Sequence, residues 1–154
     1  DRSLWKKEYI NTANFFLKQA TQSSTAASGR FYVEALIAKE HCEALDFDMT
    51  DWDKISIYYK QLVQIIDTPI TRLNQAIAMA YAGNLEEAIL KVESLKASKN
   101  LLNSHIPNAT LAHLQAKAGN SDLAYQYANE AKQKGGTPHE HQLMMSQIER
   151  LLKR

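Results

Sequence analysis

The side chains best able to do chemistry in this chain are five histidines and one cysteine, which are common zinc ligands and common partners in nucleophilic catalysis. His139 and His141 lie two positions apart, so on a helix they point about 200° away from each other and cannot share one ion. His41 and Cys42 are neighbours and diverge in the same way. We therefore expect no metal site, and we interpret Cys42 as a buried structural thiol.

Motifs that would organise a reaction are missing from the sequence. It has no glycine-rich phosphate loop and no Gly-x-Ser-x-Gly elbow. The acidic pair Glu86-Glu87 stands where a helix should begin, and carboxylates there offset the helix dipole. The sequence therefore predicts no cofactor and no enzyme. We expect aromatic residues at helical spacing to be mostly core, with an aromatic binding patch as the alternative. These residues are Trp5, Trp52, Tyr58, Tyr59 and Tyr81.

The composition suits a helical domain without nucleic-acid chemistry. The chain has 154 residues, 45% of them hydrophobic, with 18 basic against 17 acidic side chains, and it shows no local basic stripe. One cysteine excludes an internal disulfide and fits a reducing compartment. There is no apolar run of the roughly 20 residues that a membrane span needs, and no signal peptide or initiating methionine. We expect a fragment of a longer cytoplasmic protein that does not bind membranes.

Apolar residues recur at spacings of three and four almost throughout, which predicts an all-α fold over residues 1–154 as a single domain. This spacing gathers Trp5, Tyr9 and Phe16 on one face of the first helix and turns Leu45 inward at the end of the second. About eight helices are expected, at residues 3–20, 30–45, 51–66, 69–82, 85–96, 106–118, 121–134 and 138–152.

Local signals for helix starts and ends support these bounds. Asp51 and Thr68 can cap helices with a side-chain oxygen, and Thr137 opens a capping box. Gly83 is a natural residue just past a helix end, and Asn84 is expected to cap the helix that follows.

An internal repeat is visible at these turns. The segment Ala82–Ala88, Ala-Gly-Asn-Leu-Glu-Glu-Ala, is similar to Ala118–Ala124, Ala-Gly-Asn-Ser-Asp-Leu-Ala, 36 positions later. Gly takes the left-handed conformation that ends a helix, and Ala lets paired helices approach closely. This pattern is typical of tetratricopeptide repeats and predicts antiparallel helical hairpins stacked as a right-handed solenoid.

A stack of helical hairpins presents a concave face that suits recognition of polypeptide. Arg72, Asn74 and Gln75 are candidate polar groups of that face, although a solvated helix face explains them equally well. With His41 and His105 they form the candidate protein-interaction surface.

Several segments resemble, in order and spacing, the C-terminal region of extracytoplasmic-function sigma factors that carry an added tetratricopeptide-like domain. Two departures stand out: Gln75 occupies a usual Arg position, and Ser104–Asn108 replaces a Tyr-His-Leu-Leu-His start. The matching segments are Asp1–Trp5, Gly29–Ala38 with His41, Thr50–Trp52 with Ile55 and Tyr58, and Thr68–Ala78.

The resemblance implies a role in promoter-specific transcription initiation in bacteria. The implied partners are the protein's own N-terminal sigma domains and core RNA polymerase, and promoter DNA would be contacted only through those missing domains. In that family the extension is thought to modulate sigma activity in place of a separate anti-sigma protein. The alternatives are a stand-alone scaffold that binds a peptide of an unrelated partner and, more remotely, an enzyme of unrecognised type.

Overall fold

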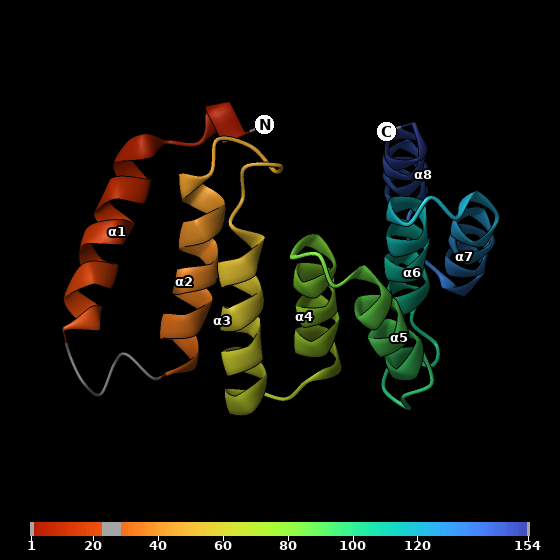
Figure 1. Cartoon of the computed structure of the whole chain (residues 1–154), viewed down its shortest axis with the longest axis horizontal. Helices are drawn as coiled ribbons and strands as arrows, with labels where there is room; N and C mark the ends of the chain where they lie inside the picture. The colour runs from red at the N-terminus through yellow and green to blue at the C-terminus, as the bar shows by residue number, and fades with distance from the viewer. Residues whose placement is uncertain (1, 23–28, 154) are drawn as a thin grey trace. The chain divides into compact units, whose positions relative to one another are not determined.

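The computed structural model describes residues 2–22 and 29–153, and in those residues it contains helices and no strand (Figure 1). The prediction of an all-α fold with eight helices is therefore confirmed. A short 3-10 turn, η1 (Arg2–Leu4), comes first. The α-helices are α1 (Lys7–Thr21), α2 (Arg30–Glu43), α3 (Trp52–Ile65), α4 (Pro69–Tyr81), α5 (Leu85–Lys96), α6 (Ile106–Lys117), α7 (Ser121–Lys134) and α8 (Pro138–Leu152).

The chain forms two compact units, which we call unit 1 (Asp1–Thr71) and unit 2 (Arg72–Arg154). Helix α4 crosses the boundary, so nearly all of it belongs to unit 2. The prediction of a single domain over residues 1–154 stays a prediction.

Unit 1 is a row of three helices, α1, α2 and α3, that run alternately in opposite directions (Figure 1). Its buried apolar side chains come from α2 and α3 alone, among the residues described. They are Val33, Ile37, Ile55 and Leu62. Helix α1 packs on α2 without burying any of its own side chains. The packed part of unit 1 is therefore the α2–α3 pair.

Unit 2 has the larger core, and alanine dominates its helix contacts. One cluster joins α4, α5 and α6, and its buried residues are Leu73, Ala76, Ala80, Ala88, Val92, Leu101, Leu111 and Leu114. A second cluster joins α6, α7 and α8, and its buried residues are Ala112, Ala116, Ala124, Ala128 and Ile148. Because these alanines have almost no exposed surface, the paired helices lie close together.

Helix α8 covers one side of unit 2. It packs on α6 and α7 through Ile148, which is fully buried, with Met144 and Leu151 beside it. Its opposite face is mostly polar, because His139, Gln142 and other exposed hydrophilic residues occupy it. The apolar surface of α6 and α7 is thus shielded by a helix with a hydrophilic outside.

The two repeat corners have the same backbone geometry. Gly83 has φ of 93° and Gly119 has φ of 79°, in the left-handed region that favours glycine. At the first corner the Asn84 amide donates to the Met79 carbonyl oxygen at 2.9 Å, and at the second the Asn120 amide donates to the carbonyl oxygen of Gln115, also at 2.9 Å. Both bonds close a Schellman turn, so the prediction that these glycines end helices is confirmed.

The predicted asparagine cap is wrong. The side chain of Asn84 makes no capping hydrogen bond, and neither does that of Asn120. The Asn120 side-chain amide instead donates to Gln115 Oε1 at 2.8 Å. In both corners the asparagine contributes its backbone amide, which closes the turn behind it.

The other predicted caps are present. The Asp51 carboxylate accepts from the Lys54 amide, and Thr137 forms a complete capping box with Glu140. Thr68 Oγ1 accepts from the Thr71 amide at 3.1 Å. These three starts are local in sequence, which explains why the sequence predicts them.

Two helix bounds differ from those expected by more than one residue. Helix α1 begins at Lys7 rather than residue 3, because the first residues form η1. Helix α2 ends at Glu43, and Ala44 is extended with ψ of 135°, so Leu45 is 84% exposed instead of inward. The Arg2 guanidinium explains this early end: it donates to the carbonyl oxygens of Ala44 and Asp46, at 3.2 and 2.7 Å, and holds that segment outside the helix.

We expect Gly83→Ala to lower the free energy of unfolding by about 1 kcal/mol, because a Cβ disfavours positive φ. A Cβ there would meet no atom within 4 Å, so the cost is conformational and not steric. Gly83→Asn should cost less, since asparagine tolerates this region. Chemical denaturation followed by circular dichroism measures both. Equal losses for Ala and Asn would contradict the left-handed corner.

We expect Ala124→Leu to destabilise the chain by about 1–3 kcal/mol, because it forces extra volume between α6 and α7. Ala124 has no exposed surface, whereas Ala118, at the exposed corner, offers a matched control. Ala118→Leu should change stability by less than about 0.5 kcal/mol. The same denaturation measurement compares them, and equal tolerance at both positions would argue against close helix pairing.

Candidate functional site

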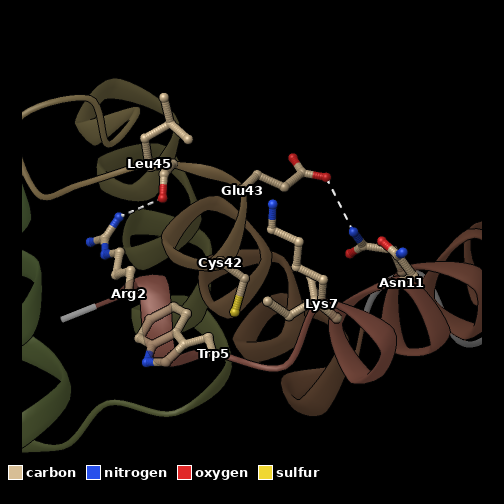
Figure 2. A pocket seen from close by; sticks show the side chains of 10 residues that line it. Arg2, Trp5, Lys7, Asn11, Cys42, Glu43 and Leu45 are labelled. Carbon is tan, nitrogen blue, oxygen red and sulfur yellow. Dashed lines mark hydrogen bonds between the residues drawn. The ribbon is translucent and has the colours of Figure 1, made fainter.

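A pocket with both polar and apolar walls lies at the end of unit 1 where η1 meets α1 and α2 (Figure 2). Its volume is about 600 Å³, and we call it the Arg2 pocket. The guanidinium carbon of Arg2 lies 5.7 Å from the centroid of the Trp5 ring. Nη1 of the same side chain donates to the carbonyl oxygens of Ala44 and Asp46, just after α2. Its lining residues are Arg2, Trp5, Lys7, Ile10, Asn11, Asn14, Cys42, Glu43, Ala44 and Leu45.

The polar groups of the Arg2 pocket are mostly held by one another. The Asn14 side-chain amide donates to Glu43 Oε1 at 3.3 Å, which links α1 to α2. Lys39 Nζ donates to the other Glu43 oxygen at 2.8 Å. Hydrogen bonding to Glu43 is the main reason why the pKa of Lys39 is raised. These bonds form a structural network and do not present an acid and a base to a shared reacting atom.

A second, apolar groove runs between α1 and α2 on unit 1, and Cys42 contributes to both this groove and the Arg2 pocket. Its volume is about 290 Å³, and we call it the α1–α2 groove. Cys42 is half-buried, and its side chain forms part of the wall of both the Arg2 pocket and this groove. The groove is lined by Tyr9, Ile10, Ala13, Asn14, Leu17, Ala35, Ala38, Lys39 and Cys42.

His41 does not pair with the neighbouring thiol but packs against an aromatic ring. Its imidazole lies edge-on to Trp52, with ring centroids 5.4 Å apart. Burial, followed by the charge of Arg2, lowers the pKa of His41. The imidazole is therefore favoured in its neutral form as part of the α2–α3 packing.

Unit 2 holds a cluster of polar aromatic contacts. The Tyr81 hydroxyl is hydrogen-bonded to His113 Nε2, and Lys117 Nζ lies 4.5 Å from the centroid of the Tyr81 ring. Burial lowers the pKa of His113, and the positive charges of Lys117 and Arg150 lower it further. Neutral His113 thus joins α4 to α6 and is not available as a cation near neutral pH.

A parallel cluster joins α5 to α7. The Tyr127 hydroxyl donates to Glu93, and Lys96 Nζ bonds Glu130 Oε2 at 3.0 Å. The same ammonium lies 4.8 Å from the centroid of the Tyr127 ring. Burial, with the hydrogen bond to Glu93 next in importance, raises the pKa of Tyr127 to about 12.

The residues expected to form the interaction surface do not all face solvent. Of the three on α4, Asn74 is exposed, Arg72 is half-buried and Gln75 is only 8% exposed. Gln75 Oε1 accepts from Lys91 Nζ at 2.9 Å, which ties α4 to α5. His41 belongs to unit 1, and His105 stands at the start of α6.

The structure brings His105 close to a histidine that the sequence does not pair with it. A Cβ built on Gly136 would lie 3.5 Å from His105 Cδ2 and 3.2 Å from His141 Cε1, so both rings flank that glycine. Their 36-residue separation gives no local signal of this proximity. In residues 2–22 and 29–153, no three histidine, cysteine or acidic side chains are grouped as a metal would require.

The exposed face of α1 is the feature that sequence reasoning assigned wrongly. Tyr9 is 68% exposed and Phe16 is 62% exposed, although helical spacing predicts a core face there. Ile10 and Leu17 turn toward α2 instead, and they are only half-buried. The apolar stripe of α1 is wider than the surface that α2 covers, which leaves aromatic side chains in solvent.

Comparisons with known proteins add little to this geometry. A Rhizobium meliloti protein described as uncharacterized is 30% identical over 95 residues, which are 62% of this chain. Those residues are 22% of that relative, so the chain spans about a fifth of its length. No family model and no solved structure matches the chain.

The helices of the described residues are also short for the hydrocarbon core of a bilayer. The longest of them, α1 and α8, have 15 residues each, and in the described part of the chain no helix is long and apolar enough to span a membrane.

The raised pKa of Tyr127 predicts a pH effect with a definite sign. The folded chain favours the neutral phenol, so Tyr127 stabilises the fold fully below about pH 10 and loses that contribution as the pH rises toward 12. In a tyrosinate absorbance titration, Tyr127→Phe should remove a late transition. A titration curve unchanged in its late part by the substitution would contradict the contact with Glu93.

Proposed function

We propose that this chain is the C-terminal regulatory, protein-interaction domain of a sigma factor, the subunit that directs bacterial RNA polymerase to promoters. The observation that supports it most is the ordered series of segments that resemble this region of the sigma family. They begin at Asp1–Trp5 and end at Thr68–Ala78, so they cover the first half of the chain. The domain itself has no catalytic role.

The residues of this resemblance are used to build the link between α2 and α3. Thr50 is buried, and its hydroxyl donates to the Asp46 carbonyl oxygen at 3.0 Å. Asp51 caps α3, and Trp52 Nε1 donates to the Phe47 carbonyl oxygen at 3.2 Å. The motif Thr-Asp-Trp therefore stabilises the connection between α2 and α3. Partners of the domain would contact exposed helix faces instead.

The finer architecture that we propose for the domain is a tetratricopeptide-like solenoid. Bonds between hairpins join positions about one repeat apart: Glu93 with Tyr127 and Lys96 with Glu130 are both 34 residues apart. Tyr81 and His113, 32 residues apart, make the corresponding link between α4 and α6. Equivalent helices of successive hairpins thus contact each other, as stacking of repeats requires.

In this role the chain packs on the sigma domains of its own protein or on core RNA polymerase in the cytoplasm. Promoter DNA is bound by the other domains, because this chain has nearly balanced charge, with 18 basic and 17 acidic residues. A change in how the extension packs alters the availability of those domains, which is how it regulates initiation.

The test is transcription in vitro with core polymerase and the longer protein that contains this chain. We expect removal of residues 1–154 to change promoter-dependent transcript yield about fivefold or more, the lower range of coupling between sites. Trp52→Ala, which breaks the α2–α3 link, should reproduce part of the effect. Phe31→Ser should leave the α2–α3 link intact, because that ring is 79% exposed, so this variant controls for the fold.

The alternative is a stand-alone scaffold that binds a peptide of an unrelated partner. The same helical hairpins would suit that role. Unchanged transcription after the deletion, together with no co-purification of this chain with sigma domains or polymerase, would rule out the sigma role. The sequence that precedes Asp1 in the gene distinguishes the two directly, since a scaffold would not follow promoter-binding helices.

A further inference from the structure

Exposed apolar residues are concentrated in unit 1. Of the seventeen large hydrophobic side chains that are exposed in the described residues, twelve belong to unit 1, while only four of the nineteen buried hydrophobic residues, alanines included, do. Helix α1 is the extreme case, because none of its residues is buried. Exposed apolar surface of this kind marks an interaction site, so α1 is a candidate for contact with a partner.

The shape of the α1–α2 groove matches one kind of partner. On α1, Tyr9, Ala13 and Leu17 follow one another at spacings of four, and on α2 Ala35, Ala38 and Cys42 do so at three and four. Two such rows form the ridges between which the side chains of a third helix can pack.

Small side chains keep that space open. Ala13 and Ala38 are both exposed and both line the groove, so at these two positions no large side chain fills it. The polar groups of the wall are few, and Lys39 is already paired with Glu43 at 2.8 Å. Apolar side chains of an occupant would meet matching surface over the length of the groove.

The charge at one end of the groove specifies the occupant further. Lys6 and Lys7 stand at the N-terminus of α1, where the helix dipole is already positive, and together they outnumber the single acidic residue of the first turn, Glu8. Lys6 Nζ lies 5.5 Å from the centroid of the Tyr9 ring, at the edge of the groove. Within the described residues neither lysine has a carboxylate at ion-pair distance, and α1 has no side-chain cap. An acidic group of a partner would complement this end.

We propose that the α1–α2 groove binds an amphipathic helix of a protein partner, with its apolar face between α1 and α2 and acidic residues beside Lys6 and Lys7. The inference rests on the proposed function only in that the chain binds protein; it does not require the partner to be a sigma domain.

The test uses residues 1–154 and a fluorescent synthetic helix of about 18 residues, five turns. The helix carries leucine and alanine at every third and fourth position and glutamates in its first turn. We expect saturable binding by anisotropy. Ala13→Glu and Ala38→Glu, which put a carboxylate in the groove, should each weaken binding about tenfold or more. As a control, Phe31→Ser removes a ring of α2 that is 79% exposed and lies outside the groove. It should change the affinity for the helix less than about twofold.

The charge arm uses Lys6→Glu/Lys7→Glu and a second probe with lysines in place of the glutamates. The double variant should weaken binding of the acidic probe and improve binding of the basic one, because the sign of the contact is reversed. Circular dichroism of each variant checks that α1 stays folded. Loss of affinity for both probes alike would mean that charge complementarity is absent and would overturn the proposal.

Three further results would also overturn it. These are no binding of the acidic helix, a dimer by light scattering that Ala13→Glu converts to a monomer, and binding to phosphatidylserine vesicles in preference to the helix. The dimer would mean that a second copy fills the groove, and the vesicle result that a lipid surface does. Because none of these measurements involves polymerase, failure here leaves the transcription test unaffected, and the reverse also holds.

Discussion

Close approach of helix backbones at alanine positions is the constraint on which unit 2 depends. Ala88 and Ala124 are fully buried at equivalent places, one turn after the two glycine corners. A larger residue at either place would push its hairpin apart, and a corner without positive φ would aim the second helix elsewhere. The bonds that Asn84 and Asn120 close at 2.9 Å are thus a precondition for the contacts made by these alanines.

Local signals made much of this structure predictable. Apolar spacing predicts the helices, and Thr137, Asp51 and Gly83 predict where particular ones begin and end, because each acts within four residues of itself. Helix α2 ends early for a reason that no local pattern carries: Arg2 holds the carbonyl oxygen of Ala44, 42 residues away. Long-range bonds of this kind are what sequence patterning cannot supply.

The candidate surface was harder to predict than the fold. Gln75 is polar and sits on a helix, yet Lys91 holds its side chain inward, while the apolar Tyr9 and Phe16 face solvent. Periodicity identifies the stripe of a helix that is able to be buried; it does not say whether a neighbour is wide enough to cover it. Among the described helices, α2 is the one that packs on α1 extensively, and the uncovered part of the stripe becomes the surface of interest.

The helix that shields unit 2 has a consequence for self-assembly. A head-to-tail filament needs two complementary apolar surfaces on every subunit, so that each copy can both give and receive a contact. Helix α8 offers a hydrophilic exterior, with His139 and Gln142 in solvent, whereas α1 leaves Tyr9 and Phe16 uncovered. Because the exterior of α8 is mostly polar, with Leu143 as an exposed apolar exception, this helix offers little of the second apolar surface that growth of such a filament would require.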